Sequence, residues 1–135
     1  MIEYLLDTNI LSYFIRGRHA DLNARLTQSI ERDNACMSVM VRAEMRFGQN
    51  GMPVNDKRRQ AIDLLLDQIP ALPWTAAAAD AYGLLKVQLQ STGRPIGELD
   101  TQIAAHALAE GLILVTHNTR HFDRIAGLQL EDWTV

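Results

Sequence analysis

The sequence predicts an α/β fold in which a short central parallel sheet of about five strands carries helices on both faces. Short apolar runs rich in strand formers alternate with longer segments of helical periodicity. One or two helices separate successive strands, which implies parallel pairing through right-handed crossovers. Residues 112–115 are apolar at nearly every position, as expected for a strand that is buried on both faces of such a sheet.

Two strand–helix units are expected in the first half of the chain. Each strand is a short apolar run, and each is followed by a polar residue that can cap a helix, Asp7 after the first and Ser38 after the second. Arg16 and Gly17 end the first helix. The strands are expected at residues 2–6 and 35–37, and the helices at residues 10–16, 20–30 and 39–48.

The second half begins after a polar loop at residues 49–56. Pro70 and Pro73 restrict the strand between them to an edge of the sheet, because proline cannot donate a ladder hydrogen bond. Thr75 caps a long alanine-rich helix, and Gly111 closes the helix that follows it. The helices are expected at residues 57–68, 75–90 and 100–110, and the strands at residues 71–72, 112–115 and 128–130.

Length and composition predict one soluble domain over residues 1–135. The chain is 47% hydrophobic and 21% charged, values that exclude wholesale disorder. Its single cysteine, Cys36, excludes an intramolecular disulfide, and no apolar run approaches the roughly 20 residues needed to cross a bilayer. We therefore expect a cytoplasmic protein with no membrane contact.

The net charge of −3 gives no sign of the basic excess that is typical of proteins binding nucleic acid through bulk electrostatics. Basic residues nevertheless gather locally, and a cation bound among acidic residues would locally reverse the sign of the charge. The composition therefore argues against a broad basic surface and leaves a local nucleic-acid site open.

Three carboxylates are the main candidate site residues. Asp7 follows the first strand, and in open parallel sheets the carboxyl ends of the strands border the crevice where ligands bind. Glu44 and Asp100 each lie on a helical stripe whose other residues are small or apolar. Each carboxylate also has an ordinary alternative. Asp7 and Asp100 can cap helices, and Glu44 can pair with Arg42 or Arg46 or reach water at the edge of its stripe.

The mutual repulsion of these carboxylates predicts a positive partner. Two carboxylates about 5 Å apart repel by roughly 3 kcal/mol at an effective dielectric constant near 20. Three such pairs cost around 10 kcal/mol, comparable with the whole stability of a small domain. Protonation or a divalent cation would relieve this cost, and oxygen-only ligation favours Mg²⁺, with Mn²⁺ as the alternative, over zinc.

Several short motifs occur in a specific order and at specific separations. They are Leu6-Asp7-Thr8-Asn9, Ala43-Glu44, Gly93-Arg94-Pro95-Ile96-Gly97 running into Asp100, residues 103–107, residues 114–122 and Glu131-Asp132-Trp133. With them, nearly the whole chain resembles the VapC toxins, which are PIN-domain ribonucleases of bacterial toxin–antitoxin pairs. The resemblance implies a PIN fold and a metal-dependent endoribonuclease that inhibits translation. Its implied substrate is tRNA, including the anticodon region of initiator tRNA.

The resemblance also assigns the site. It implies that Asp7, Glu44 and Asp100 are the acidic metal-site residues, with Asp7 and Asp100 the most direct ligands. Many relatives carry aspartate at a fourth position, which Asn118 occupies here. An amide oxygen can bind a cation or position a water but brings no charge, so we expect one metal ion rather than two. Glu98 is open as an extra acid or a solvated loop residue. Asp123 is likewise open as an extra acid or an exposed helix start.

The implied partners are a VapB-like antitoxin, a second copy of the chain, and DNA only through the antitoxin. The antitoxin would bury apolar surface and insert a basic side chain among the carboxylates. The apolar stripes in residues 10–15 and 22–30 offer contact surfaces, although the core is their first use. Arg94, Arg120 and Arg124 are candidates for binding RNA phosphates, with solvated surface charge as the alternative for each.

Two other functions stay open at this stage. Asn118 is compatible with a catalytically weak PIN-fold module that acts with an antitoxin in DNA-bound autoregulation. A phosphatase with Asp7 as nucleophile is the third interpretation, but Asn9 stands where its second aspartate would be. His106 is expected to be a hydrogen-bonded core residue, whereas His117 has a better claim to the site because it precedes Asn118.

Overall fold

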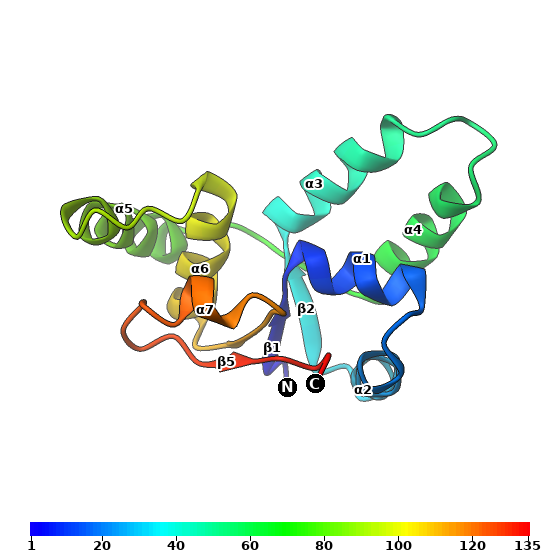
Figure 1. The fold of residues 1–135 in the computed structure, drawn as a ribbon, viewed down its shortest axis with the longest axis horizontal. Helices are drawn as coiled ribbons and strands as arrows, with labels where there is room; N and C mark the ends of the chain where they lie inside the picture. The colour runs from blue at the N-terminus through cyan, green and yellow to red at the C-terminus, as the bar shows by residue number, and fades with distance from the viewer.

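Five short parallel strands form the central sheet, in the order β3-β2-β1-β4-β5 (Figure 1). The computed structural model describes residues 1–135. Every neighbouring pair of strands is parallel, so the α/β class and the parallel sheet expected from the sequence are confirmed. The strands are β1 (Tyr4–Leu6), β2 (Ala35–Ser38), β3 (Ala71–Leu72), β4 (Ile113–Val115) and β5 (Leu130–Glu131).

Seven helices cover the two faces of this sheet. Figure 1 shows α1 to α4 on one side of the central strands and α5 to α7 on the other, as right-handed crossovers require when the chain reverses its direction across the sheet. None of these helices combines the length and the apolar character needed to span a bilayer. The helices are α1 (Thr8–Arg16), α2 (Ala20–Glu31), α3 (Val39–Asn50), α4 (Lys57–Gln68), α5 (Ala76–Ser91), α6 (Glu98–Glu110) and α7 (Thr119–Phe122).

The strand order creates a crevice beside β1. From β1 the chain passes to β2 on one side, whereas β4 is added later on the other side. Connections therefore diverge from the carboxyl ends of β1 and β4, which is the place where open α/β sheets bind ligands. Asp7 continues this edge, because its backbone N–H donates to the Val115 carbonyl at 3.2 Å.

Polar side chains start three helices as the sequence predicts. Asp7 Oδ1 accepts a hydrogen bond from Ile10 N at 2.8 Å, Ser38 Oγ accepts from Met40 N, and Thr75 Oγ1 accepts from Ala78 N. Asp7 directly follows β1, and Ser38 is the last residue of β2. The turn from strand to helix is therefore fixed locally at each point, and it places the start of each helix at the carboxyl edge of the sheet.

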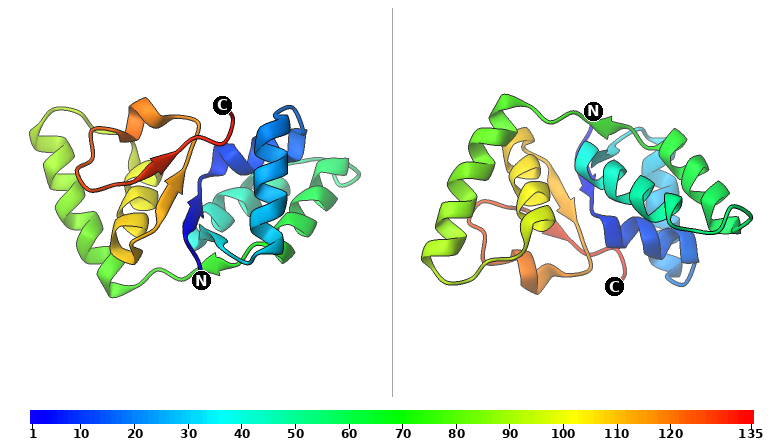
Figure 2. Two further views of the ribbon diagram at one scale, coloured as in Figure 1. Left: turned by 90° about the horizontal axis from the view of Figure 1, so that it is seen from below. Right: turned by 90° about the horizontal axis from the view of Figure 1, so that it is seen from above.

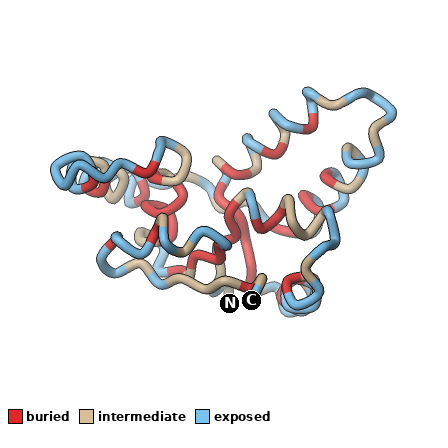
Figure 3. Tube along the Cα trace, viewed as in Figure 1, coloured by how far each residue is buried: buried red, intermediate tan, exposed pale blue.

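The core lies along the central strands and the inner faces of the helices, as the buried segments in Figure 3 show. Leu5 and Leu6 of β1 are fully buried. The stripes at residues 10–15 and 22–30 serve the core, which confirms the core as their first use, whereas their use as contact surfaces stays a prediction. The buried residues of these stripes are Ile10, Leu11, Leu22 and Leu26.

Some element boundaries differ from the expectation. Helix α6 begins at Glu98 instead of residue 100, and α7 was not expected, because four residues are too few to show a helical period. Asp123 follows the last residue of α7, so the helix-start role is wrong for it. Strand β5 is shifted to Leu130–Glu131, where it pairs with Leu114 and Val115 of β4.

His106 on α6 ties three parts of the fold together and is fully buried. Its Nε2 lies 3.1 Å from the Pro73 carbonyl, which can only accept, so Nε2 carries the proton. Its Nδ1, 2.8 Å from Ser38 Oγ, therefore accepts from that hydroxyl, which itself accepts from Met40 N. This network joins α6 to the start of α3 and to the segment before α5, and it confirms His106 as a hydrogen-bonded core residue.

Replacing His106 should destabilise the protein. His106→Ala leaves the Ser38 hydroxyl and the Pro73 carbonyl without their partner and opens a cavity, so we expect a loss of about 2–4 kcal/mol in the free energy of unfolding. Urea unfolding measures it. His19→Ala is the matched control, because His19 is half-exposed and its side chain does not cap α2, and it should cost less than about 1 kcal/mol. Equal losses would contradict the network.

Acid should weaken the wild type more than His106→Ala. Burial holds the pKa of His106 below its ordinary value of 6.5. The unfolded chain therefore binds this proton more readily, and the free energy of unfolding falls as the pH drops below about 6.5. Urea midpoints between about pH 7 and about pH 5 should converge for the two proteins. Parallel midpoints across this range would show that His106 does not contribute to acid sensitivity.

Candidate active site

Asp7, Glu44 and Asp100 line one pocket at the carboxyl edge of the sheet. We call it the acidic pocket; it has a volume of about 140 Å³, and its other lining residues are Thr8, Asn9 and Leu99. The three carboxylates come from the end of β1, from α3 and from the first turn of α6. Their convergence is confirmed, whereas their binding of a cation stays a prediction.

Asp7 is both a helix cap and a wall of the acidic pocket. Its side chain is buried, and burial raises the pKa of its carboxyl from 3.8 to about 6. Hydrogen bonds from the Thr116 side chain and Ile10 N lower this pKa, whereas the charges of Asp100 and Asp132 raise it further. The capping alternative and the site prediction therefore hold together for one residue.

Glu44 reaches the acidic pocket from the solvent-exposed side of α3. The ion-pair alternative is wrong, because Arg46 pairs with Asp63 at 2.6 Å and Arg42 donates to a backbone carbonyl. The expected core-facing stripe is wrong too, since Phe47, one turn further along, is 78% exposed. Glu44 is thus an unpaired carboxylate in contact with water. The buried face of α3 consists of Val41, Met45 and Gln49.

Asp100 lies in the first turn of α6 and is half-buried. Gly97 is the N-cap of this helix, so the capping alternative for Asp100 is wrong. Burial raises the pKa of Asp100, and the neighbouring His121 opposes this shift. His121 Nε2 lies 2.9 Å from Asp100 Oδ2 and 2.8 Å from the Ile96 carbonyl. Because a carbonyl only accepts, Nε2 carries a proton that it directs at both oxygens.

Sequence reasoning missed His121, Thr116 and Asp132 as neighbours of the carboxylates. Thr116 directly follows β4 and Asp132 directly follows β5, at the same edge of the sheet as Asp7. A search for every polar residue just beyond a parallel strand would have found both. His121 lies on α7, whose four residues gave no helical signal.

The donors of the acidic pocket fit a divalent cation that prefers oxygen. They are carboxylates, a hydroxyl and an amide, with no thiol or imidazole among the lining residues. Thr8 Oγ1 is buried without a hydrogen-bond partner, which leaves an oxygen unused at the pocket. No three His, Cys, Asp or Glu side chains are gathered tightly enough to form a ready-made metal cluster. Binding would therefore have to draw the carboxylates closer together.

The other predicted site residues lie outside the acidic pocket. Asn118 and Arg120 line a neighbouring pocket of about 340 Å³, together with Asn9, Tyr13, His117 and Thr119, which we call the amide pocket. Asn9 lines both pockets, so the two adjoin. His117 thus lies beside the site, as its position before Asn118 suggested.

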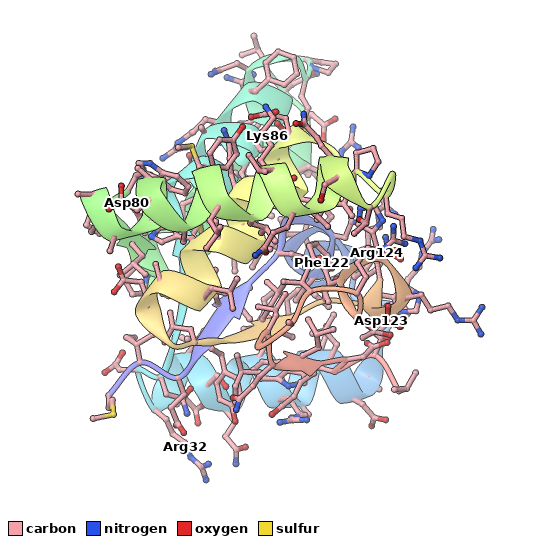
Figure 4. All side chains as sticks on the ribbon, turned by 90° about the vertical axis from the view of Figure 1, so that its left-hand side faces the viewer. Arg32, Asp80, Lys86, Phe122, Asp123 and Arg124 are labelled. Carbon is pink, nitrogen blue, oxygen red and sulfur yellow. The ribbon has the colours of Figure 1, made fainter.

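Two predicted phosphate-binding arginines lie elsewhere. Arg94 and Arg124 line a third pocket on the α5 side, so the three predicted arginines do not converge. Figure 4 shows Asp123 and Arg124 close together at the surface beside α7. Glu98 is not a lining residue of the acidic pocket; it pairs with Lys86 at 2.9 Å and contacts the Tyr82 hydroxyl.

Comparison with known proteins identifies the family of the chain. The family model of the PIN domain matches residues 4–128. The chain is 34% identical over 134 residues to the tRNA(fMet)-specific endonuclease VapC of Shigella flexneri. The match covers 99% of this chain and 100% of that protein. The chain belongs to the VapC group of PIN-domain proteins. The PIN fold expected from the resemblance is thereby confirmed.

Two solved VapC-containing complexes share the fold over its full extent. VapBC2 from Rickettsia felis, solved bound to a DNA fragment from their promoter, aligns with a TM-score of 0.86 at 33% identity, covering 98% of this chain and 99% of that chain. VapBC-1 from nontypeable Haemophilus influenzae aligns with a TM-score of 0.86 at 36% identity, covering 100% of both chains. This VapC chain therefore has the architecture of proteins found in antitoxin complexes.

Asp7→Asn should stabilise this VapC chain in the presence of a chelator. The folded state holds the Asp7 proton more tightly than the unfolded chain, whose pKa is near 3.8, so the free energy of unfolding falls as the pH rises to about 6 and stays lower above it. A shift of this size corresponds to roughly 3 kcal/mol. Asparagine keeps an oxygen for Ile10 N, so we expect a gain of roughly 1–3 kcal/mol near pH 7.5.

Thermal and urea unfolding with and without Mn²⁺ measure this effect. Mn²⁺ should raise the midpoint of the wild type and leave that of Asp7→Asn nearly unchanged, because the variant lacks a carboxylate ligand. Asp67→Asn, an exposed change on α4, is the control and should behave like the wild type. A variant less stable than the wild type in chelator would show that ionised Asp7 is not under strain.

Proposed function

We propose that this chain is a metal-dependent endoribonuclease that acts as the toxin of a toxin–antitoxin pair. The observation that carries the proposal is the convergence of Asp7, Glu44 and Asp100 on one pocket at the carboxyl edge of the sheet. The ribonuclease names of its VapC relatives support the same activity. Mg²⁺ is the proposed cofactor, with Mn²⁺ as the alternative.

Each carboxylate has a distinct proposed role. Asp7 and Asp100 bind the cation through their oxygens, and His121 orients the Asp100 carboxylate by donating from Nε2. When bound, the cation supplies Lewis acidity and lowers the pKa of a coordinated water. Glu44, exposed and unpaired, accepts the proton of the attacking water. Because water is the nucleophile, the RNA 2′-hydroxyl takes no part and the product keeps a 5′-phosphate.

The proposed substrate class is tRNA. The Shigella flexneri relative, which matches nearly the whole chain, is named for cleavage of tRNA(fMet). Initiator tRNA, cut in the anticodon region, is therefore the first substrate to test. Arg120 is the best-placed of the three predicted phosphate-binding arginines, because its pocket adjoins the carboxylates.

The proposed protein partners occupy opposite ends of the molecule. A VapB-like antitoxin would bind the groove between α1, α3 and α4, where Ile15, Met45 and Met52 lie beside Glu44. A basic antitoxin side chain placed there would neutralise the carboxylates, and DNA would be contacted only through the antitoxin. A second copy of the chain would cover Leu84 and Val87 on α5, each 63% exposed. Figure 2 shows α5 far from α3 and α4.

Cleavage of folded tRNA tests the proposed activity. With Mg²⁺ or Mn²⁺, the wild type should produce fragments with 5′-phosphate ends, and Asp7→Asn or Asp100→Asn should lower the rate by at least about 100-fold. Glu44→Gln should lower it by about 10²–10⁴-fold, the range of a general base. Glu98→Gln is the matched control and should cleave like the wild type, because Glu98 pairs with Lys86 outside the acidic pocket.

Sequencing of RNA ends identifies the bond that is cut. A 2′,3′-cyclic phosphate product would overturn the water mechanism, and full activity of Asp7→Asn would remove the metal-site assignment. If the folded wild type cleaves no RNA with either cation, the chain acts instead as a binding module for an antitoxin.

The α5 surface should control self-association. Leu84→Lys and Val87→Lys each place a charge in the proposed interface and should convert a dimer to a monomer, as measured by light scattering. Leu64→Lys on α4 is the matched control, since Leu64 is 57% exposed and lies on the other side of the sheet. A wild type that is monomeric, or a dimer that survives both α5 changes, would contradict this interface.

A further inference from the structure

The amide pocket beside the carboxylates has a different chemical character from the acidic pocket. Its lining residues are Asn9, Tyr13, His117, Asn118, Thr119 and Arg120, with no carboxylate among them. At about 340 Å³ it is larger than the acidic pocket, at about 140 Å³. Asn9 lines both pockets, so an extended molecule bound at the carboxylates can continue into the amide pocket.

Three polar side chains of the amide pocket, those of Asn9, Asn118 and Arg120, are free to bind a ligand. Hydrogen bonds within the protein involve the backbone of Asn118 and leave the side-chain amides of Asn9 and Asn118 unused. Arg120 forms no ion pair and is exposed. Each amide offers both donors and an acceptor, the combination that reads the edge of a nucleobase.

Tyr13 forms the aromatic wall of this pocket, and its neighbours hold it in place. Its ring packs edge-on against the ring of His117, with centroids 5.8 Å apart, and lies tilted against the ring of His19, with centroids 5.1 Å apart. The Nδ1 of His117 is fixed in turn by Thr134 Oγ1 at 2.8 Å and Asp132 Oδ2 at 3.2 Å. The segment after β5 therefore supports the pocket from behind. A fixed aromatic ring suits stacking of a base, which contributes about 1–3 kcal/mol.

We propose that the amide pocket binds the nucleobase next to the scissile phosphate of a single-stranded RNA segment. Tyr13 stacks on the base, Asn9 and Asn118 hydrogen-bond its edge, and Arg120 binds the adjoining phosphate. The inference rests on the proposed ribonuclease function and adds a specificity determinant to it. It also gives Asn118 a role that suits an amide: an aspartate there would repel the phosphate and could only accept hydrogen bonds.

Nucleotide binding without a divalent cation tests the pocket separately from catalysis. Each of the four ribonucleoside 5′-monophosphates is titrated into ¹⁵N-labelled protein and followed by NMR. Ribose 5-phosphate, which lacks a base, is the comparator. We expect the side-chain amide signals of Asn9 and Asn118 to shift, and the affinities of the four nucleotides to differ by about threefold or more. Unmoved amide signals, or equal affinity for ribose 5-phosphate, would overturn the base site.

Variants separate the roles of the pocket residues. Tyr13→Leu and Asn118→Ala should each weaken nucleotide binding by about fivefold or more, whereas Tyr13→Phe, which keeps the stacking ring, should bind like the wild type. Arg120→Ala should weaken the binding of nucleotides and the binding of ribose 5-phosphate by a similar factor. Arg32→Ala is its matched control, because Arg32 lies before β2, at the opposite edge of the sheet (Figure 4). Unfolding midpoints within about 2 °C confirm that each variant is folded.

Cleavage assays then distinguish failure of the pocket from failure of the activity. If the wild type cuts RNA, Asn118→Ala should raise KM and broaden the choice of cleavage site. If KM and the cleavage sites are unchanged in Asn118→Ala and Tyr13→Leu, the proposed base site is contradicted and the proposed ribonuclease function is not. If the wild type binds nucleotides in a base-dependent way but cuts no RNA, the proposed ribonuclease function is contradicted. The base site then stands as the site of a nucleotide-binding protein.

Discussion

Burial of the Asp7 carboxylate at the end of β1 is the constraint around which the carboxyl edge of the sheet is organised. A buried carboxylate needs compensation, and the protein supplies only part of it, through Ile10 N and Thr116. The remaining imbalance is visible as a pKa raised to about 6. Asp7, which caps α1, is thus also the carboxylate whose ionised form a bound cation would stabilise. The same side chain serves local folding and the proposed function.

The positions of the other two carboxylates depend on a buried contact whose residues do not line the pocket. Glu44 lies on α3 and Asp100 on α6, and these helices lie on opposite faces of the sheet. His106 joins them, because its ring bonds the Ser38 hydroxyl that caps α3. A fully satisfied buried network permits one arrangement of its members, which fixes the middle of α6 against the start of α3. The pocket is therefore held by the core instead of by its own mutually repelling residues.

Local features could be predicted from the pattern of the sequence, and the order of its motifs predicted the convergence of Asp7, Glu44 and Asp100. Individual side-chain contacts between distant elements could not be predicted. The alternation of strands and helices and the caps at Asp7, Ser38 and Thr75 are local, and they were predicted. The predicted core-facing orientation of Glu44 was wrong, because Phe47 lies on the same helical stripe but is exposed to solvent and does not pack in the core. His121 was missed because its contact with Asp100 joins α7 to α6, and α7 is too short to show a period.

The two adjoining pockets suggest how an acidic protein would bind RNA in the proposed function. A net charge of −3 argues against attraction over a broad surface, so the energy of binding RNA would come mainly from a few short-range contacts. A cation among the carboxylates would hold the scissile phosphate, and Arg120 would add one further phosphate contact. Few neutralised phosphates imply a shallow dependence of affinity on salt. The proposed stacking and amide contacts, which are much less sensitive to salt, would then contribute most to the choice of RNA. An exposed loop base would reach them where a paired base would not.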